Sequence, residues 1–230
     1  MDYGAAFTFV TQDEEWMKKM GIASALALFS PLLGITLIPL LGWMLEISRR
    51  VATNEDPVLP GWDNFGGYFT TGIKAIVVLL VWTLPLIIVS TCLAGAGALG
   101  SSQMASSDDA EILILALNLC IIIIAFPYAL ALNILVPAAL GTLGVTGELG
   151  AAIKPGNSWR LVRGNFGGYI VVWLIAAFVP NILTSIGLII CGIGAAVGLA
   201  YSMALLGHLY GQAYSVSNTA PAEDPGMAEA

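Results

Sequence analysis

The sequence predicts an all-α protein, a polytopic bundle of about five transmembrane helices built as two parallel pseudo-repeats plus a final helix. Of its residues, 58% are hydrophobic and 10% are charged, against about 45–50% and about 25% in soluble domains. Apolar stretches longer than the roughly 20 residues that cross a hydrocarbon core recur along the whole chain. This composition leaves too little polar surface for a water-soluble globule, so we predict one integral membrane domain over residues 1–217.

The first apolar stretch, Gly21–Ile47, follows an N-terminal segment of mixed aromatic and charged residues at 3–19. That segment is typical of a helix at the headgroup boundary, and a polar leader fits it as well. Pro31, Gly34 and Pro39 interrupt the stretch, so we expect a span that is kinked or partly unwound. A hairpin around Pro31 would instead raise the number of crossings to six. No secretory signal pattern precedes the stretch, and we expect it to be retained.

A charged collar and a polar linker follow, at residues 48–64. Glu46, Arg49 and Arg50 stand at i, i+3 and i+4, a spacing that favours ion pairs at the membrane boundary. Trp62 is typical of an interfacial anchor, and Asn64 of a helix N-cap. The adjacent Gly66 and Gly67 predict that the next helix begins close against a neighbour.

The second span is predicted from about residue 69 to 99, with a bend at Pro85. A polar loop without basic residues, 100–111, leads to a third apolar stretch at 112–145, which is too long for one straight crossing. Pro127 and Pro137 are its expected break points. A tilted broken helix and a re-entrant piece both fit this pattern.

A second linker, 146–165, leads to the fourth span, predicted from Phe166 to about Pro180 and separated there from residues 182–190. The last helix is predicted at 191–214, where glycines spaced four residues apart, at 194 and 198 and at 207 and 211, favour close helix packing. The remaining stretch, 218–230, is acidic and rich in Ala and Pro, which predicts a disordered tail.

Asn64-Phe65-Gly66-Gly67-Tyr68 recurs as Asn165-Phe166-Gly167-Gly168-Tyr169, and each copy opens an apolar stretch. The prolines of the first stretch are echoed by those of the third. We therefore predict one pseudo-repeat at about 20–99, a second at about 112–190 and an additional helix after them.

The basic residues set the expected orientation, because cytoplasmic loops carry an excess of Lys and Arg. With five crossings and the N-terminus outside, Lys18 and Lys19 face one side and the other six basic residues face the opposite side, that of both linkers. We expect the cell (inner, cytoplasmic) membrane, with linkers 48–64 and 146–165 and the C-terminal tail in the cytoplasm. Six crossings would move only the N-terminus inside.

Several stretches resemble a family of bacterial and archaeal membrane proteins, domain of unknown function 4013 (DUF4013). They are Asp2–Ala5, Glu15–Lys19, Leu41–Met44 with Arg49–Val51, and Leu59–Gly66 followed by Gly72–Lys74. The resemblance covers about the first ninety residues through motifs and the remainder through hydropathy. Trp159–Phe166 is also similar to the entry motif of other multi-span families and of the membrane region of some glycerophosphodiester phosphodiesterases. The resemblance implies a multi-span fold and supplies no catalytic residue.

No set of residues in the sequence suggests catalysis, a metal site or a cofactor, and we predict that the protein is not an enzyme. Cys92, Cys120 and Cys191 lack the spacing of a metal or disulfide framework. His208 is the only histidine, and a histidine at membrane depth serves as a proton relay, a tetrapyrrole ligand or a packing residue that reaches the headgroups. Asn118 and Asn133 are expected to bond between helices or to line a polar path.

Two functions remain. The first is a non-enzymatic scaffold or accessory subunit, with membrane lipids as partners, in a homo-oligomer or a larger membrane complex and without nucleic acid. The alternative is a small-molecule or lipid transporter or channel-like protein that uses proline-broken helices. Few ionisable groups lie inside the spans, which favours the scaffold. Candidate contacts with lipid or a partner are Arg49, Arg50, Trp62, Asp63, Trp159, Arg160 and Arg163.

Overall fold

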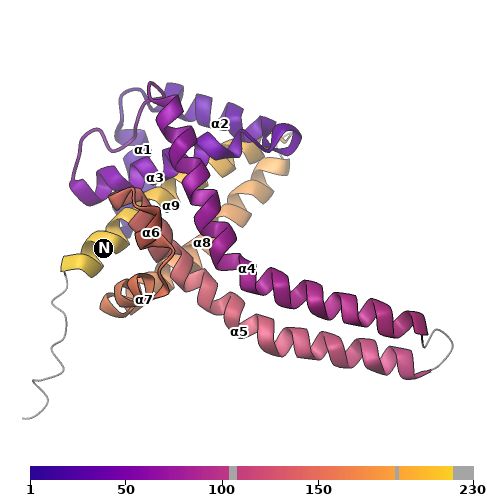
Figure 1. The fold of residues 1–230 in the computed structure, drawn as a ribbon. Coiled ribbons are helices and arrows are strands. Elements are labelled where there is room, and N and C mark those ends of the chain that lie inside the picture. The colour runs from indigo at the N-terminus through magenta and orange to yellow at the C-terminus, as the bar shows by residue number, and fades with distance from the viewer. Residues whose placement is uncertain (104–107, 190–191, 220–230) are drawn as a thin grey trace, which may run out of the picture.

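A computed structural model describes residues 1–103, 108–189 and 192–219, and all regular secondary structure in these ranges is helical (Figure 1). The helices are α1 (Tyr3–Gln12), α2 (Trp16–Leu33), α3 (Leu37–Thr53), α4 (Phe65–Gln103), α5 (Asp108–Thr146), α6 (Leu149–Ala152), α7 (Pro155–Gly164), α8 (Phe166–Ile189) and α9 (Ile193–Thr219). The all-α fold class is confirmed. Most of the predicted tail, and Cys191, lie outside the described residues.

Four of the described helices are long and apolar enough to cross a bilayer. They contain the segments Phe65–Cys92 of α4, Ala125–Thr146 of α5, Phe166–Ile189 of α8 and Ile193–Thr219 of α9. These segments correspond to the second, third, fourth and fifth predicted spans. Their length and composition are those of a polytopic helical membrane protein.

The first predicted span is divided into two shorter helices, α2 and α3, neither of which is among the four candidate spans. The division falls at Gly34, which ends α2 with a φ of +37°, a backbone conformation that favours glycine. Pro31 stays inside α2 and Pro39 lies in the first turns of α3. The break therefore lies at Gly34, one of the three residues expected to interrupt the stretch, and not at either proline.

The expected breaks in the third and fourth spans are also absent from the described helices. Helix α5 continues through Pro127 and Pro137, and α8 continues through Pro180. Proline removes one main-chain donor, but the neighbouring turns keep the helix intact. Helix α4 contains Pro85 and bends along its length, as predicted (Figure 1).

Helix α3 packs at the centre of the bundle, against α4, α5 and α9. Where α3 and α4 cross, glycines face main-chain atoms. A Cβ added at Gly42 would lie 2.7 Å from the Cα of Tyr68, and one at Gly72 would lie 2.7 Å from the carbonyl carbon of Ile38. The two helices approach this closely only because neither position carries a side chain.

Helix α9 uses its two glycine pairs against different neighbours. Gly207 and Gly211 face main-chain carbonyls of α3, whereas Gly194 and Gly198 face the main chain of α8. The close packing predicted from these spacings is confirmed. Helix α9 is therefore held between α3 and α8.

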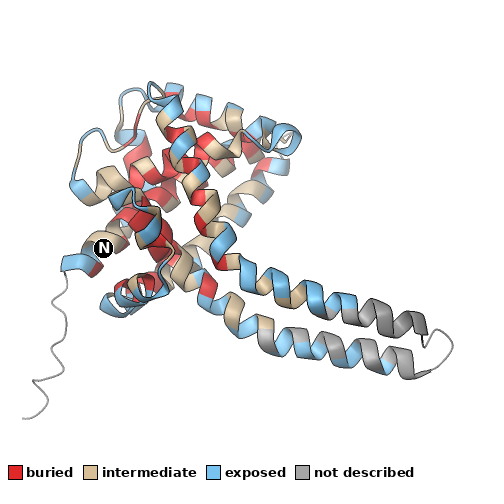
Figure 2. Cartoon of the chain, viewed as in Figure 1, coloured by how far each residue is buried: buried red, intermediate tan, exposed pale blue. Residues whose placement is uncertain are grey.

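The distal part of α4 and the first part of α5 project from the bundle as a long arm, residues 83–103 and 108–131 (Figure 1). Buried residues gather in the bundle, whereas no arm residue whose burial is described is buried (Figure 2). The exposed side chains include Ile88, Ile123 and Phe126. Apolar surface of this extent requires lipid or another protein around it.

The N-terminus lies beside both linkers. The main-chain N–H of Asp2 donates to the Gln212 side chain at 2.8 Å, near the end of α9, and the Asn165 side chain contacts the Met1 sulfur at 3.3 Å. These contacts place the N-terminus and the second linker on the same side of the bundle, whereas the arrangement with five crossings would have them on opposite sides of the membrane. They match the alternative, in which the first stretch turns back.

Candidate functional site: the linker face

The two copies of Asn-Phe-Gly-Gly-Tyr form the same helix cap. The Asn64 side chain accepts a hydrogen bond from the Gly67 N–H at 3.2 Å, and Asn165 accepts one from Gly168 at 3.2 Å. A Cβ at either glycine would lie 2.7 Å from the Cγ of its capping asparagine. The predicted N-cap at Asn64 is confirmed. We expected the glycines to make room for a neighbouring helix, but Gly67 and Gly168 make room for the cap instead.

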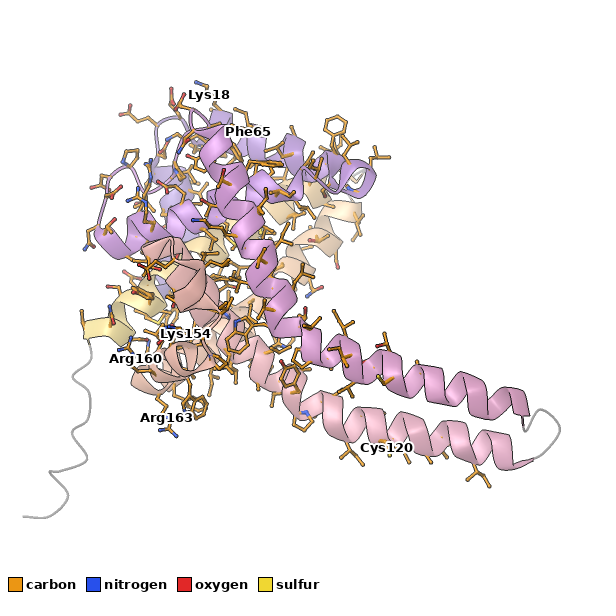
Figure 3. The ribbon with its side chains drawn as sticks, in the orientation of Figure 1. Lys18, Phe65, Cys120, Lys154, Arg160 and Arg163 are labelled. Atoms are coloured by element: carbon orange, nitrogen blue, oxygen red, sulfur yellow. The ribbon has the colours of Figure 1, made fainter. Side chains whose placement is uncertain are left out.

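The caps belong to a polar surface that we call the linker face. It comprises residues 54–64, residues 147–165, Met1 and Asp2, and the end of α9 at 212–219. Basic residues lie in or next to this face: Lys19 donates to the Leu59 carbonyl at 2.9 Å, and Lys74 donates to that of Gly147 at 3.0 Å. Lys18 precedes Lys19, and the other five are Arg49, Arg50, Lys154, Arg160 and Arg163. Seven of the eight basic residues of the chain thus lie in or next to the linker face, whereas the exposed Lys18 lies away from α7 (Figure 3).

Trp62 holds linker 54–64 against the bundle. Its ring stacks on that of Trp43, with centroids 5.4 Å apart, and its Nε1–H donates to the Lys19 carbonyl at 2.9 Å. The Tyr68 ring meets it edge-on at 5.7 Å, and the Tyr68 hydroxyl donates to the Gly61 carbonyl at 2.7 Å. These contacts occupy much of the Trp62 side chain, although Asp63 beside it is exposed.

Arg49 and Arg50 are bound by carboxylates of their own chain. Arg49 pairs with Glu46 at 2.8 Å and with Glu55 at 2.6 Å, and Arg50 pairs with Glu46 at 3.1 Å and donates to the Pro57 carbonyl at 2.8 Å. The Arg49 guanidinium lowers the pKa of the Glu55 carboxyl. The predicted pairs with Glu46 are confirmed. Glu55, six residues beyond Arg49, is a partner that helical spacing does not predict; it reaches Arg49 because a left-handed residue, Asn54, turns the chain back.

The basic residues of α7 are arranged differently. Trp159, Arg160 and Arg163 are exposed, as is Lys154 at the N-cap position. The Arg163 guanidinium lies over the Trp159 ring, 4.8 Å from its centroid. Figure 3 shows Lys154, Arg160 and Arg163 on the same side of the molecule. Lys154 was not among the predicted contact residues, although it stands in the same basic linker.

His208 lies under α1. The residue is 5% exposed, and its ring packs against Phe9 at 4.6 Å between centroids and places Nδ1 3.3 Å from the Gln212 amide nitrogen. It borders an open cavity of about 410 Å³ that Asp2, Arg50, Glu55 and Gln212 also line. Instead of reaching headgroups, the histidine joins α1 to α9.

The asparagines of the apolar helices do not link helices where their contacts are described. Asn133 donates to the Ala129 carbonyl at 2.7 Å, and Asn181 donates to that of Ala177 at 2.7 Å, each within its own helix. The interhelical bonds expected of Asn133 are thus replaced by a bond one turn back. Asn118 lies in α5, but its side chain is outside the described part of the structure.

Residues 25–207, most of the chain, match the family model described as Protein of unknown function (DUF4013). The chain belongs to this family. No curated protein and no solved structure matches the chain. The match starts after the N-terminal motifs that we compared with DUF4013 and extends well beyond the first ninety residues.

In this DUF4013 chain, the described residues contain no group of three His, Cys, Asp or Glu side chains that could hold a metal ion. Cys92 and Cys120 are exposed and unpaired on the arm helices. The seven predicted contact residues divide into two sets. Arg49, Arg50 and Trp62 hold the first linker in place, whereas Asp63 and the α7 residues Trp159, Arg160 and Arg163 face outward.

Proposed function

We propose that this DUF4013 protein is a non-enzymatic membrane scaffold or accessory subunit that acts through contacts of its helices with lipids and other proteins. The main support is the packing of the bundle. Helix α3 meets α4 and α9 through glycines that face main-chain atoms. Such contacts leave little space for a solute between these helices.

The prolines give less support to the alternative, transport through broken helices. Pro39 and Pro137 are buried, whereas Pro31 and Pro127 are exposed, so the four do not share one surface. None of them lines the cavity described above. Transporters place unwound helix segments around a central binding site, but the break between α2 and α3 falls at the exposed Gly34, and α5 continues through both of its prolines.

The proposal places the protein in the cell membrane with the linker face in the cytoplasm. The positive-inside rule supports this orientation, since seven of the eight basic residues lie in or next to that face. We further propose that the chain consists of two parallel pseudo-repeats. One linker joins α3 to α4, the other joins α5 to α8, and both linkers end in the same cap.

The experiment is site-specific photocrosslinking in cells from two positions of α4. Ile88 on the arm is 52% exposed, and Val78 in the bundle is 0% exposed. A photoreactive amino acid at Ile88 is expected to crosslink a discrete protein, either a second copy or another subunit, while the same residue at Val78 crosslinks only within the chain.

The purified protein is also reconstituted in vesicles, where the scaffold is expected to be inactive in flux assays. Crosslinks from Ile88 to lipid alone, together with solute flux through the vesicles, would refute the scaffold and support transport.

A further inference from the structure

We infer that α7 carries a binding site for the headgroups of anionic phospholipids, formed by Lys154, Trp159, Arg160 and Arg163. This inference rests on the proposed function, because it names the class of lipid that one surface of the membrane scaffold binds. The inference applies to α7 and not to the cluster around Arg49, although the two clusters contain the same residue types.

The two faces of α7 differ sharply. Ser158, Leu161 and Val162 are buried against the bundle. Trp159, Arg160 and Arg163 are exposed at positions i, i+1 and i+4, which lie within an arc of about 100° on a helix. The chain thus presents two guanidinium groups and an indole on one surface.

The cations of this surface are available to a ligand. Within the described residues, the ion pairs involve Lys19, Arg49 and Arg50, and none involves Lys154, Arg160 or Arg163. Arg163 lies over the Trp159 ring, an arrangement that leaves its N–H groups free. A guanidinium binds a phosphate through two parallel hydrogen bonds.

The position of α7 brings it to the level of the headgroups. It connects α5 to α8, and both helices contain segments long and apolar enough to cross a bilayer. Trp159 is 47% exposed, and Phe166 at the start of α8 is 52% exposed. Aromatic rings beside cations suit the boundary between acyl chains and headgroups.

The acidic C-terminal tail is the competing occupant. Its acids are Glu223, Asp224 and Glu229, and α9 ends close to α7, because a Cβ added at Gly164 would lie 3.2 Å from the Ser217 carbonyl oxygen. Charge alone fits both occupants. The exposed aromatic rings favour lipid, because aromatic rings beside cations are typical of the boundary between acyl chains and headgroups.

The test measures which lipid lies next to Trp159. The full chain is reconstituted in phosphatidylcholine vesicles that contain either brominated phosphatidylglycerol or brominated phosphatidylcholine, both of which quench indole fluorescence. Each protein is compared with its Trp159→Phe counterpart, so that the difference isolates Trp159 from the other tryptophans. Phosphatidylglycerol is expected to quench at a lower mole fraction than phosphatidylcholine.

Arg160→Gln is expected to lower this preference about fivefold, and Arg160→Gln with Arg163→Gln about 25-fold, because each basic residue near an anionic surface contributes about 1 kcal/mol. Lys18→Gln is the matched control. Lys18 is exposed, has no ion pair among the described residues and lies away from α7 (Figure 3). This control is expected to leave the preference unchanged.

Equal quenching by the two lipids would overturn the inference, as would an equal loss in Lys18→Gln and Arg160→Gln. A chain ending at Thr219 tests the tail: an unchanged preference supports lipid, and a large gain identifies the tail as the occupant and overturns the inference. None of these outcomes affects the crosslinking and flux results, so the inference and the proposed function fail separately.

Discussion

Gly72→Ala is expected to destabilise the protein strongly, because the α3–α4 contact has no space for a methyl group. The new carbon would lie 2.7 Å from the carbonyl carbon of Ile38, whereas carbon atoms pack at about 3.5–4.0 Å. The helices must therefore separate by about 1 Å. A gap of this size forfeits up to about half of the contact energy, and overpacking costs about 1–3 kcal/mol. We expect a loss of about 2–3 kcal/mol.

The assay is thermal unfolding in mild detergent, followed by tryptophan fluorescence, with an expected decrease in Tm of about 5–10 °C. Gly66→Ala is the matched control on the same helix, because nothing lies within 4 Å of a Cβ at that position. Equal Tm values for the two variants would refute the reasoning. Rescue of Gly72→Ala by Ile38→Ala would also refute it. The clash is with the main chain of Ile38, and Ile38→Ala leaves that main chain in place.

Three further predictions test the caps, the charges and the topology. Asn64→Ala should cost about 1 kcal/mol in unfolding free energy, whereas Asn64→Asp, which keeps the acceptor, should cost little; equal losses would contradict the cap. Arg49 lowers the pKa of the Glu55 carboxyl below its usual 4.5. The contribution of this pair to the unfolding free energy is therefore complete above about pH 4.5 and is lost as the pH falls through the folded-state pKa. Glu55→Gln should weaken the acid dependence of Tm. In a cysteine-free background, Thr8→Cys and Gly156→Cys should both resist an impermeant thiol reagent in intact cells and react after permeabilisation; labelling of only one would show that α1 and α7 lie on opposite sides.

Local chemistry predicted much of the fold. The cap at Asn64, the pairs of Glu46 with Arg49 and Arg50, and the close packing at Gly207 involve groups a few residues apart or a small residue on one helix face. Proline was less informative, since α5 and α8 pass through their prolines while a glycine with positive φ ends α2. The cost of proline in a helix depends on neighbours that a single sequence does not show.

The site was harder to predict, because its two basic groups look alike in sequence. Arg49 differs from Arg160 through Glu55, which the turn at Asn54 brings back to α3. Lys19 lies on the linker face through its contact with the Leu59 carbonyl, forty residues away in the chain. Contacts of this range follow from the tertiary fold, so the availability of each cation is visible only in the structure.

The central position of α3 has a consequence for biogenesis. Its glycine-lined contact with α9 joins Met44 to Gly207, and the ribosome needs on the order of ten to thirty seconds to synthesise the chain between them. During that interval the surface of α3 that finally meets α9 has no native partner, and insertion factors or chaperones have time to bind it. A nascent chain that stops before α9 leaves this surface of α3 without its native partner.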